Sequence, residues 1–420
     1  MTMEIALAFV ILLVLIFLNV PIYACLLASG LYLMVFVNNM PLQSIFTVMF
    51  EGITKNSLLA IPFFVLAGNF ISGGSLGRRL IDTFSSFLKN VRAGIPLACL
   101  VSNAVFGAIS GSPPAATAVF AKIVHKPIVE SDGENLATGL VTSAAGLASI
   151  IPPSVIMIIY GIATDTSVSD MFIAGVLPGL CIVGIIGVYL VFKCKKKERV
   201  PISGRDVLQA FKRGIPVLLL PVLVLGGIYG GFVTPTEAGA LSAVYCAVVS
   251  VFVLREIKPR QIVGILRDSL TTTAQVFLLI AASAFFARAL TISQLPQWIT
   301  STFGSLPQVE FLLLLNILLL IVGCFFDPSA AILILAPMLL PAAQSLNISP
   351  IHLGIIFTVN LSVGMFTPPF GLNIFVAQSV LGYDMKAISK ALIPFIILYL
   401  IGVLLITYVP VISTLLPAIL

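Results

Sequence analysis

Long apolar runs dominate the chain, and short polar breaks separate them. Residues 93–121 and 135–164 contain no Lys, Arg, Asp or Glu, and residues 311–383 contain only Asp327. A helix that crosses a bilayer needs about 20 mostly apolar residues. The pattern therefore predicts an all-α polytopic membrane protein. We expect membrane crossings at about 4–19, 21–37, 56–74, 134–163, 171–192, 214–231, 235–253, 270–288, 351–380 and 391–409.

Two further apolar stretches, about 93–126 and 307–346, are each broken in the middle, and we predict that each is a re-entrant helical hairpin. Paired prolines also interrupt the crossings at 134–163 and 351–380. Proline removes a backbone donor and clashes with the preceding turn. Irregular backbone at membrane depth persists only where it is buried in protein or lines a cavity. These four breaks are therefore the expected location of a site.

The basic residues predict the orientation. If both hairpins re-enter, all but two of the 22 Lys and Arg residues lie on one side, the exceptions being Lys55 and Arg288. By the positive-inside rule that side is the cytoplasm. The basic segment 193–213 is then cytoplasmic and both termini are periplasmic, as expected of a multi-pass protein of the bacterial inner membrane. If the hairpins crossed as single spans, the later basic clusters would move to the other side.

Landmarks recur along the chain at an offset of about 215 residues, which indicates a duplication. We expect a first repeat at 1–195, a basic cytoplasmic linker at 196–213 and a second repeat at 214–420. Each half has five crossings, an odd number, so the two repeats are predicted to be inverted. Inverted repeats with interrupted helices are typical of secondary transporters. The recurring prolines are Pro21 and Pro235, Pro113 and Pro328, Pro152 and Pro368, Pro153 and Pro369, and Pro178 and Pro394.

Each half also has a polar or amphipathic stretch before its third crossing, at about 42–55 and 257–269. These stretches are interfacial connectors, or helices that brace a moving domain. Gly226–Gly231 contains two overlapping GxxxG spacings, which suit close helix packing within the chain or against a partner.

Composition excludes several classes of protein. The chain is 59% hydrophobic and 9% charged, whereas soluble domains are about 25% charged. A soluble enzyme and a nucleic-acid binder are therefore excluded. The six Cys form no CxxC pair and the two His lie at segment ends, so we expect no transition-metal site. No nucleotide-binding loop or nucleophile–base pair is visible, which predicts no enzymatic activity, no organic cofactor, and transport driven by an ion gradient.

The breaks carry the candidate chemistry. Carbonyls and hydroxyls freed by the prolines are hard oxygen ligands that suit Na⁺, and the half-helix after each break presents N–H donors to an anion. Ser112 and Asp327 each precede a proline, as helix N-caps do. A central intramembrane charge costs about 2.5–3.5 kcal/mol and marks function, so we expect Asp327 to bind ion or substrate as well. Ser110, Ser149, Ser154 and Thr367 could instead only hydrogen-bond neighbouring helices.

Glu237 has a more ordinary interpretation. Thr234, Pro235 and Glu237 form the pattern of a capping box at a helix start. Capping is the preferred interpretation, and a proton or sodium relay is the alternative.

Five motifs resemble those of the large membrane subunit (the M or DctM-like permease) of tripartite ATP-independent periplasmic (TRAP) transporters, and the resemblance covers essentially the whole chain. It implies an elevator-type transporter that imports an organic acid, either a C4-dicarboxylate or sialic acid, with the sialic acid members most alike. It also implies coupling to two or more Na⁺ ions, a small four-helix membrane subunit and a periplasmic binding protein. The motifs are Gly111–Thr117, Ile150–Ser154, Phe232–Gly239, Asp327–Ala330 and Met365–Asn373.

The resemblance also implies site residues. Sodium sites would lie where each hairpin tip meets the interrupted helix of its own repeat, at Ser110, Ser112, Ser149 and Ile151 and at Gly323, Asp327, Gly364 and Thr367. The substrate carboxylate would lie near Ser112, Ser154, Asp327 and Asn373. A self-sufficient sodium/anion symporter of related fold and a passive channel remain as alternatives.

Overall fold

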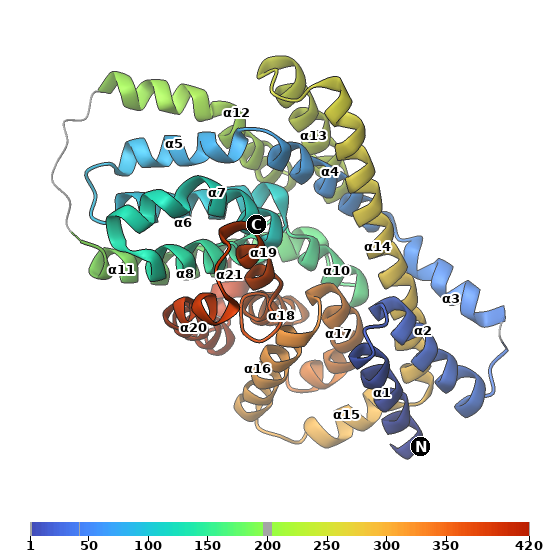
Figure 1. Ribbon diagram of the computed structural model, residues 1–420. Coiled ribbons are helices and arrows are strands. Elements are labelled where there is room, and N and C mark those ends of the chain that lie inside the picture. The colour runs from blue at the N-terminus through green and yellow to red at the C-terminus, as the bar shows by residue number, and fades with distance from the viewer. Residues whose placement is uncertain (1, 42, 196–203, 420) are drawn as a thin grey trace.

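The computed structural model describes residues 2–41, 43–195 and 204–419, and every regular element within these ranges is a helix (Figure 1). This confirms the expected all-α class. The first half contains α1 (Thr2–Phe17), α2 (Ile22–Leu31) with η1 (Tyr32–Val37), α3 (Gln43–Ile53), η2 (Asn56–Leu59) with α4 (Ala60–Gly73), α5 (Leu76–Leu88), α6 (Gly94–Ser110), α7 (Pro113–Asp132), α8 (Glu134–Ala144), α9 (Leu147–Ile150), α10 (Val155–Ala163) and α11 (Val168–Lys193).

The helices of the second half have fewer interruptions than those of the first. It contains α12 (Gly204–Tyr229), α13 (Pro235–Val248) with η3 (Val249–Val253), α14 (Pro259–Ile292), α15 (Leu295–Phe303), α16 (Gln308–Phe325), α17 (Pro328–Ser345), α18 (Pro350–Gly364), α19 (Leu372–Leu381), α20 (Met385–Tyr408) and α21 (Val411–Ile419).

Helices of the two halves pack in reciprocal pairs. Helix α4 packs on α13, and α2 packs on α14. Near the breaks, α7 packs on α19 and α10 packs on α17. The contact of α4 with α13 corresponds to that of α14 with α2 when the two halves are interchanged. The contact of α7 with α19 corresponds in the same way to that of α17 with α10.

Residues at matching positions of the two halves meet at the centre of the molecule. The hydroxyl of Ser362 donates a hydrogen bond to the carbonyl of Gly146 (2.6 Å), 216 residues away in the chain. The hydroxyl of Ser149 points to the sulfur of Met365 (3.8 Å), also 216 residues away. All residues of α18 from His352 to Gly364 are buried. The interrupted helices therefore form the core, and the other helices surround them.

Two predicted boundaries differ from the structure. Residues 259–292 form one continuous helix, α14, where we expected a separate stretch at 257–269 before a crossing at 270–288. Nothing in this segment breaks the backbone hydrogen bonds, whereas the first half turns at Lys55, whose backbone is extended. Helix α12 begins at Gly204, inside the expected linker. Residues 196–203 of that linker lie outside the described residues.

Three short helices, α5, α15 and α21, were not predicted. Helix α5 buries Leu76, Leu80 and Ile81 and exposes Arg78 and Asp82. Its charged face hides the apolar stripe from a search for long apolar runs. Apolar periodicity of about 3.6 residues is the signal that would have identified it.

Length and composition allow eight of the described helices to cross a membrane, or nine if α8–α10 is counted as one bent span. Both arms of the second hairpin, α16 and α17, are among the eight. Helix length alone does not distinguish a re-entrant hairpin from two crossings, and the ten-crossing arrangement stays a prediction. Large apolar side chains such as Phe17 (82% exposed) and Phe232 (84% exposed) face outward, as a lipid-facing surface requires.

Glu256, between η3 and α14, holds the start of α5. Its carboxylate accepts hydrogen bonds from the backbone N–H of Ser75 (2.9 Å) and from Nη2 of Arg79 (2.7 Å). Burial raises the pKa of Glu256, but the hydrogen bonds from Ser75 and Arg79 outweigh it, so the pKa lies below its ordinary value. A lowered folded-state pKa stabilises the fold above the unfolded-state pKa of about 4.3. This stabilisation is lost as the pH falls through the folded-state value.

We therefore expect Glu256→Gln to lower the melting temperature at pH 7 and to reduce the loss of stability on acidification. Thermal unfolding of both proteins in detergent, from pH 7 to below pH 4, measures this. Parallel pH profiles of the wild type and the variant would contradict it.

Candidate functional site

A cavity of about 250 Å³ lies between the tips of the two hairpins and helices α4 and α14. Ser112 from the first tip and Asp327 from the second both line it. These residues are far apart in the chain, and the fold brings them to one space. The other lining residues are Val65, Gly68, Asn69, Ser110, Gly111, Pro113, Pro114, Ala115, Val155, Ile156, Thr272, Val276, Pro328, Ser329, Met365 and Leu372.

The first tip is a tight turn between α6 and α7. Gly111 has a φ of 56°, a left-handed conformation that glycine adopts without a steric penalty. The Ser112 hydroxyl accepts a hydrogen bond from the N–H of Ala115 (3.4 Å) and caps α7. The N–H of Ser112 in turn donates to the hydroxyl of Ser110 (3.4 Å). Both hydroxyls keep their own proton, so each can still donate to an anion.

The second tip presents a carboxylate. Oδ1 of Asp327 accepts a hydrogen bond from the N–H of Ser329 (2.8 Å) and caps α17. Within the described ranges, no Lys, Arg or His forms an ion pair with Asp327. The second carboxylate oxygen is therefore free to meet a cation in the cavity.

Each hairpin packs on the interrupted helix of its own half through glycine. A Cβ atom on Gly364 would overlap the backbone of Gly323, and a Cβ atom on Gly323 would lie 3.2 Å from Cα of Gly364. In the first half, a Cβ atom on Gly107 would lie 2.5 Å from Cα of Ala148. The backbones touch at both places, so the structure brings Gly323 and Gly364 together. It places Ser110 and Ser149 near the equivalent contact.

Other predicted sodium ligands lie away from the cavity. The Ser149 hydroxyl faces Met365, as described above. Ile151 packs against Gly179 of α11. The Thr367 hydroxyl donates to the carbonyl of Val363 within its own turn (2.7 Å). Of the eight predicted ligands, only Ser110, Ser112 and Asp327 line the cavity.

Ser154 and Asn373, predicted for the substrate, are buried next to lining residues in the chain. Within the described residues, Oγ of Ser154 and Oδ1 of Asn373 have no hydrogen-bond partner. A buried polar atom without a partner costs about 1–3 kcal/mol. The role of these two residues in binding the substrate stays a prediction.

Sequence reasoning missed the opposite wall. Asn69 of α4 and Thr272 of α14 line the cavity, and Nδ2 of Asn69 donates a hydrogen bond to the hydroxyl of Ser269 (2.8 Å). The polar cluster at 269–273, inside a long apolar helix, was the available signal. Only the fold shows that Thr272 of this cluster lines the cavity with the hairpin tips.

The expected capping role of Glu237 is confirmed. The N–H of Thr234 donates to Oε2 of Glu237 (2.8 Å), and the N–H of Glu237 donates to the Thr234 hydroxyl (3.3 Å). At the neighbouring glycine motif, a Cβ atom on Gly226 or Gly231 would meet no described atom within 4 Å. These two glycines are therefore not packed closely inside the chain.

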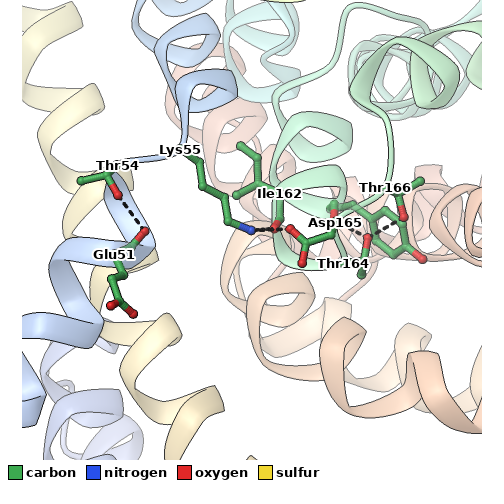
Figure 2. A network of polar contacts seen from close by, with 8 residues as sticks. Glu51, Thr54, Lys55, Ile162, Thr164, Asp165 and Thr166 are labelled. Carbon is green, nitrogen blue, oxygen red and sulfur yellow. Dashed lines mark hydrogen bonds and ion pairs between the residues drawn. The ribbon is translucent and has the colours of Figure 1, made fainter.

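A polar contact joins Lys55, between α3 and η2, to the C-terminal end of α10. Figure 2 shows Lys55 reaching from the break between α3 and η2 to the loop after α10. Its Nζ donates to the carbonyl of Ile162 (2.8 Å) and pairs with Asp165 (2.6 Å). A cation at a helix C-terminus is favourable.

The ion pair contributes little to stability because its side chains are 43% and 87% exposed. We expect Lys55→Gln to lower the free energy of unfolding by less than about 1 kcal/mol. Thermal unfolding at low and high salt measures the change. A larger loss that is insensitive to salt would contradict this assignment.

Comparison with known proteins identifies the family of the chain. The family described as "Tripartite ATP-independent periplasmic transporter, DctM component" matches residues 9–412. A C4-dicarboxylate TRAP transporter large permease protein DctM from Pseudomonas aeruginosa is 41% identical, over 88% of this chain and 88% of that protein. A sialic acid TRAP transporter large permease protein SiaM from Vibrio cholerae is 29% identical, over 96% of each chain.

The fold is also similar to that of a solved structure, the YdaH transporter of Alcanivorax borkumensis. The TM-score is 0.57 at 16% identity, with 90% of this chain and 88% of that one covered. This likeness shows the fold alone. The named relatives are permeases and not enzymes, as the sequence predicted. The chain belongs to the DctM component family of tripartite ATP-independent periplasmic transporters, that is, to their large membrane permeases.

Proposed function

We propose that the chain imports an organic acid anion across the bacterial inner membrane in symport with Na⁺. A C4-dicarboxylate is the first candidate because the 41% identical relative carries that name, and sialic acid is the second. The motifs of the sequence suggest the opposite order, with sialic acid before a C4-dicarboxylate.

The observation that carries the proposal is the convergence of both hairpin tips on one cavity. Helices α7 and α17 begin at its wall, and helix N-termini attract anions. Asp327 offers a carboxylate and Ser112 a hydroxyl to the same space. A cation beside Asp327 would offset the repulsion between this carboxylate and the substrate anion. Import of the anion would then require sodium.

Two or more Na⁺ ions fit the two glycine contacts. The contact of Gly323 with Gly364 and that of Gly107 with Ala148 occupy equivalent places in the two halves. Backbone carbonyls and nearby hydroxyls are ligands of the kind that Na⁺ prefers. We place one ion at each contact, with Asp327 serving the second and Ser110 the first.

An elevator movement is supported by the division of the fold. The hairpins and interrupted helices pack on one another, and α2, α4, α13 and α14 form a second group that meets the first mainly where α14 packs on α17 and α4 packs on α6. The reciprocal pairing of the two halves supports inverted repeats. In this mechanism the first group carries the cavity past the second.

The partners follow from the family. Its description as tripartite and periplasmic supports two further components. We propose that these are a small four-helix membrane subunit and a periplasmic protein that delivers the acid. In this arrangement both termini of the chain are periplasmic and the segment 193–213 is cytoplasmic.

Uptake by proteoliposomes tests the function. The chain is reconstituted with its small subunit, and radiolabelled succinate or sialic acid is supplied with the cognate binding protein. We expect one of the two acids to be taken up, and we expect no uptake when the binding protein is omitted. Uptake by the chain alone would favour a self-sufficient symporter and overturn the proposed partners.

A further inference from the structure

The wall of the central cavity opposite the hairpin tips comes from α4 and α14, which pack on each other (Figure 1). Val65, Gly68 and Asn69 lie on one face of α4, at the spacing of successive helical turns. Thr272 and Val276 lie on one face of α14 in the same way. The wall therefore presents two polar side chains, Asn69 and Thr272, among apolar ones.

Asn69 offers a carbonyl oxygen to the cavity. The hydroxyl of Ser269 donates to the carbonyl of Ile265 (2.7 Å), so its oxygen can only accept, and Nδ2 of Asn69 donates to it (2.8 Å). This bond fixes the orientation of the amide. In the described part of the chain Oδ1 of Asn69 has no hydrogen-bond partner, and it is not one of the buried unpaired oxygens. It is therefore an open acceptor.

Thr272 adds a second acceptor to the wall. Its hydroxyl donates to the carbonyl of Asp268 (2.9 Å), so its proton is used inside the helix and its oxygen can only accept from the cavity. Among the described residues that line the cavity, none is Lys, Arg or His. This wall therefore suits an uncharged hydrogen-bond donor. A hydroxyl group is such a donor, whereas an ionised carboxylate carries acceptors only.

A small ligand reaches both sides of the cavity. A Cβ atom on Gly68 would lie 3.0 Å from the carbonyl oxygen of Ser110, so the wall touches the first hairpin tip. The cavity has a volume of about 250 Å³. An acid whose carboxylates lie at the hairpin tips therefore also meets Asn69 and Thr272, and the groups on its carbon chain face this wall.

We propose that Asn69 and Thr272 select an acid that carries a hydroxyl group on its carbon chain. This inference rests on the proposed import of an organic acid anion and names the chemical class of that acid. In a four-carbon diacid the carboxylates lie at the two tips, and a hydroxyl at C2 donates to Oδ1 of Asn69. Without that hydroxyl the acceptors of the wall stay unpaired. The several hydroxyls of sialic acid offer the same chemistry.

Calorimetric titration of the purified transporter tests the proposal. The chain and its small subunit are titrated in Na⁺ with malate, succinate and sialic acid separately. The binding protein is left out because it has a selectivity of its own. Malate and succinate differ by one hydroxyl group. We expect malate to bind about fivefold more tightly, as one added hydrogen bond gives. Asn69→Leu should bind the two acids equally, with its affinity for succinate unchanged.

Asn38→Leu is the matched control. Nδ2 of Asn38 donates to the hydroxyl of Ser293, just after α14 (3.1 Å), much as Asn69 donates to Ser269. Asn38 lies outside the cavity lining. Both variants therefore lose an amide–serine hydrogen bond to this region, and only Asn69→Leu removes an acceptor from the cavity. Asn38→Leu should keep the preference for malate.

The outcomes separate this inference from the proposed function. Equal binding of malate and succinate by the wild type would overturn the inference and leave the proposed function in place. A preference for malate that persists in Asn69→Leu would also overturn it, because another group then recognises the hydroxyl. Tighter binding of sialic acid than of malate, weakened in Asn69→Leu, would support it with a sugar acid as the source. Binding of none of the three acids would contradict the inference and the proposed function together.

Discussion

We expect replacement of Asp327 with alanine to abolish sodium-dependent uptake in proteoliposomes while leaving expression intact. Asp327 is the only charged residue in 311–383, and its carboxylate lines the cavity without a basic partner in the described chain. Loss of a charged ligand is worth about 3 kcal/mol, or about a hundredfold in affinity. We therefore expect residual uptake near the background of empty vesicles.

A second substitution separates the charge of Asp327 from its role as a helix cap. Asparagine caps helices as well as aspartate does, so Asp327→Asn retains the hydrogen bond to Ser329 and removes the charge. We expect this variant to melt like the wild type and to lose transport and sodium binding. Near-normal uptake by Asp327→Asn would reduce Asp327 to a structural cap.

Replacing Gly364 with alanine separates the second hairpin from its interrupted helix. The added Cβ atom would overlap the backbone of Gly323, and neither backbone can yield without moving a helix. Overpacking of this kind costs about 1–3 kcal/mol. We expect a lower melting temperature, and we also expect sodium to lose its stabilising effect on the protein. Differential scanning fluorimetry with and without Na⁺ measures both.

Gly184 in α11 provides the matched control. A Cβ atom there would meet no described atom of another segment within 4 Å, and alanine favours helix more than glycine does. Gly184→Ala should therefore melt at or above the wild-type temperature and keep the response to sodium. A normal sodium response in Gly364→Ala would contradict an ion site at this contact.

The breaks in the chain were predictable because proline and glycine act locally. The first hairpin turns between Ser110 and Pro113, within the predicted motif, and the first interrupted helix breaks between Ile150 and Val155. Both paired-proline bonds, Pro152–Pro153 and Pro368–Pro369, are cis, which the sequence does not encode visibly.

Features that depend on distant segments were not predictable. Asn69 and Thr272 line the cavity only because α4 and α14 pack beside the hairpin tips. Ser154 was assigned to the substrate from its motif, yet it is buried beside the lining. Its chain neighbour Val155 lines the cavity instead, because side-chain direction depends on the turn after the prolines. Spacing in the sequence does not determine that direction.

Uptake with and without a sodium gradient tests the central claim most directly. The reconstituted transporter, its binding protein and labelled acid are kept constant, and external Na⁺ is replaced by choline at the same membrane potential. We expect accumulation of the acid to fall to the level of Asp327→Asn vesicles. Undiminished accumulation in choline would contradict sodium coupling through the hairpin-tip cavity.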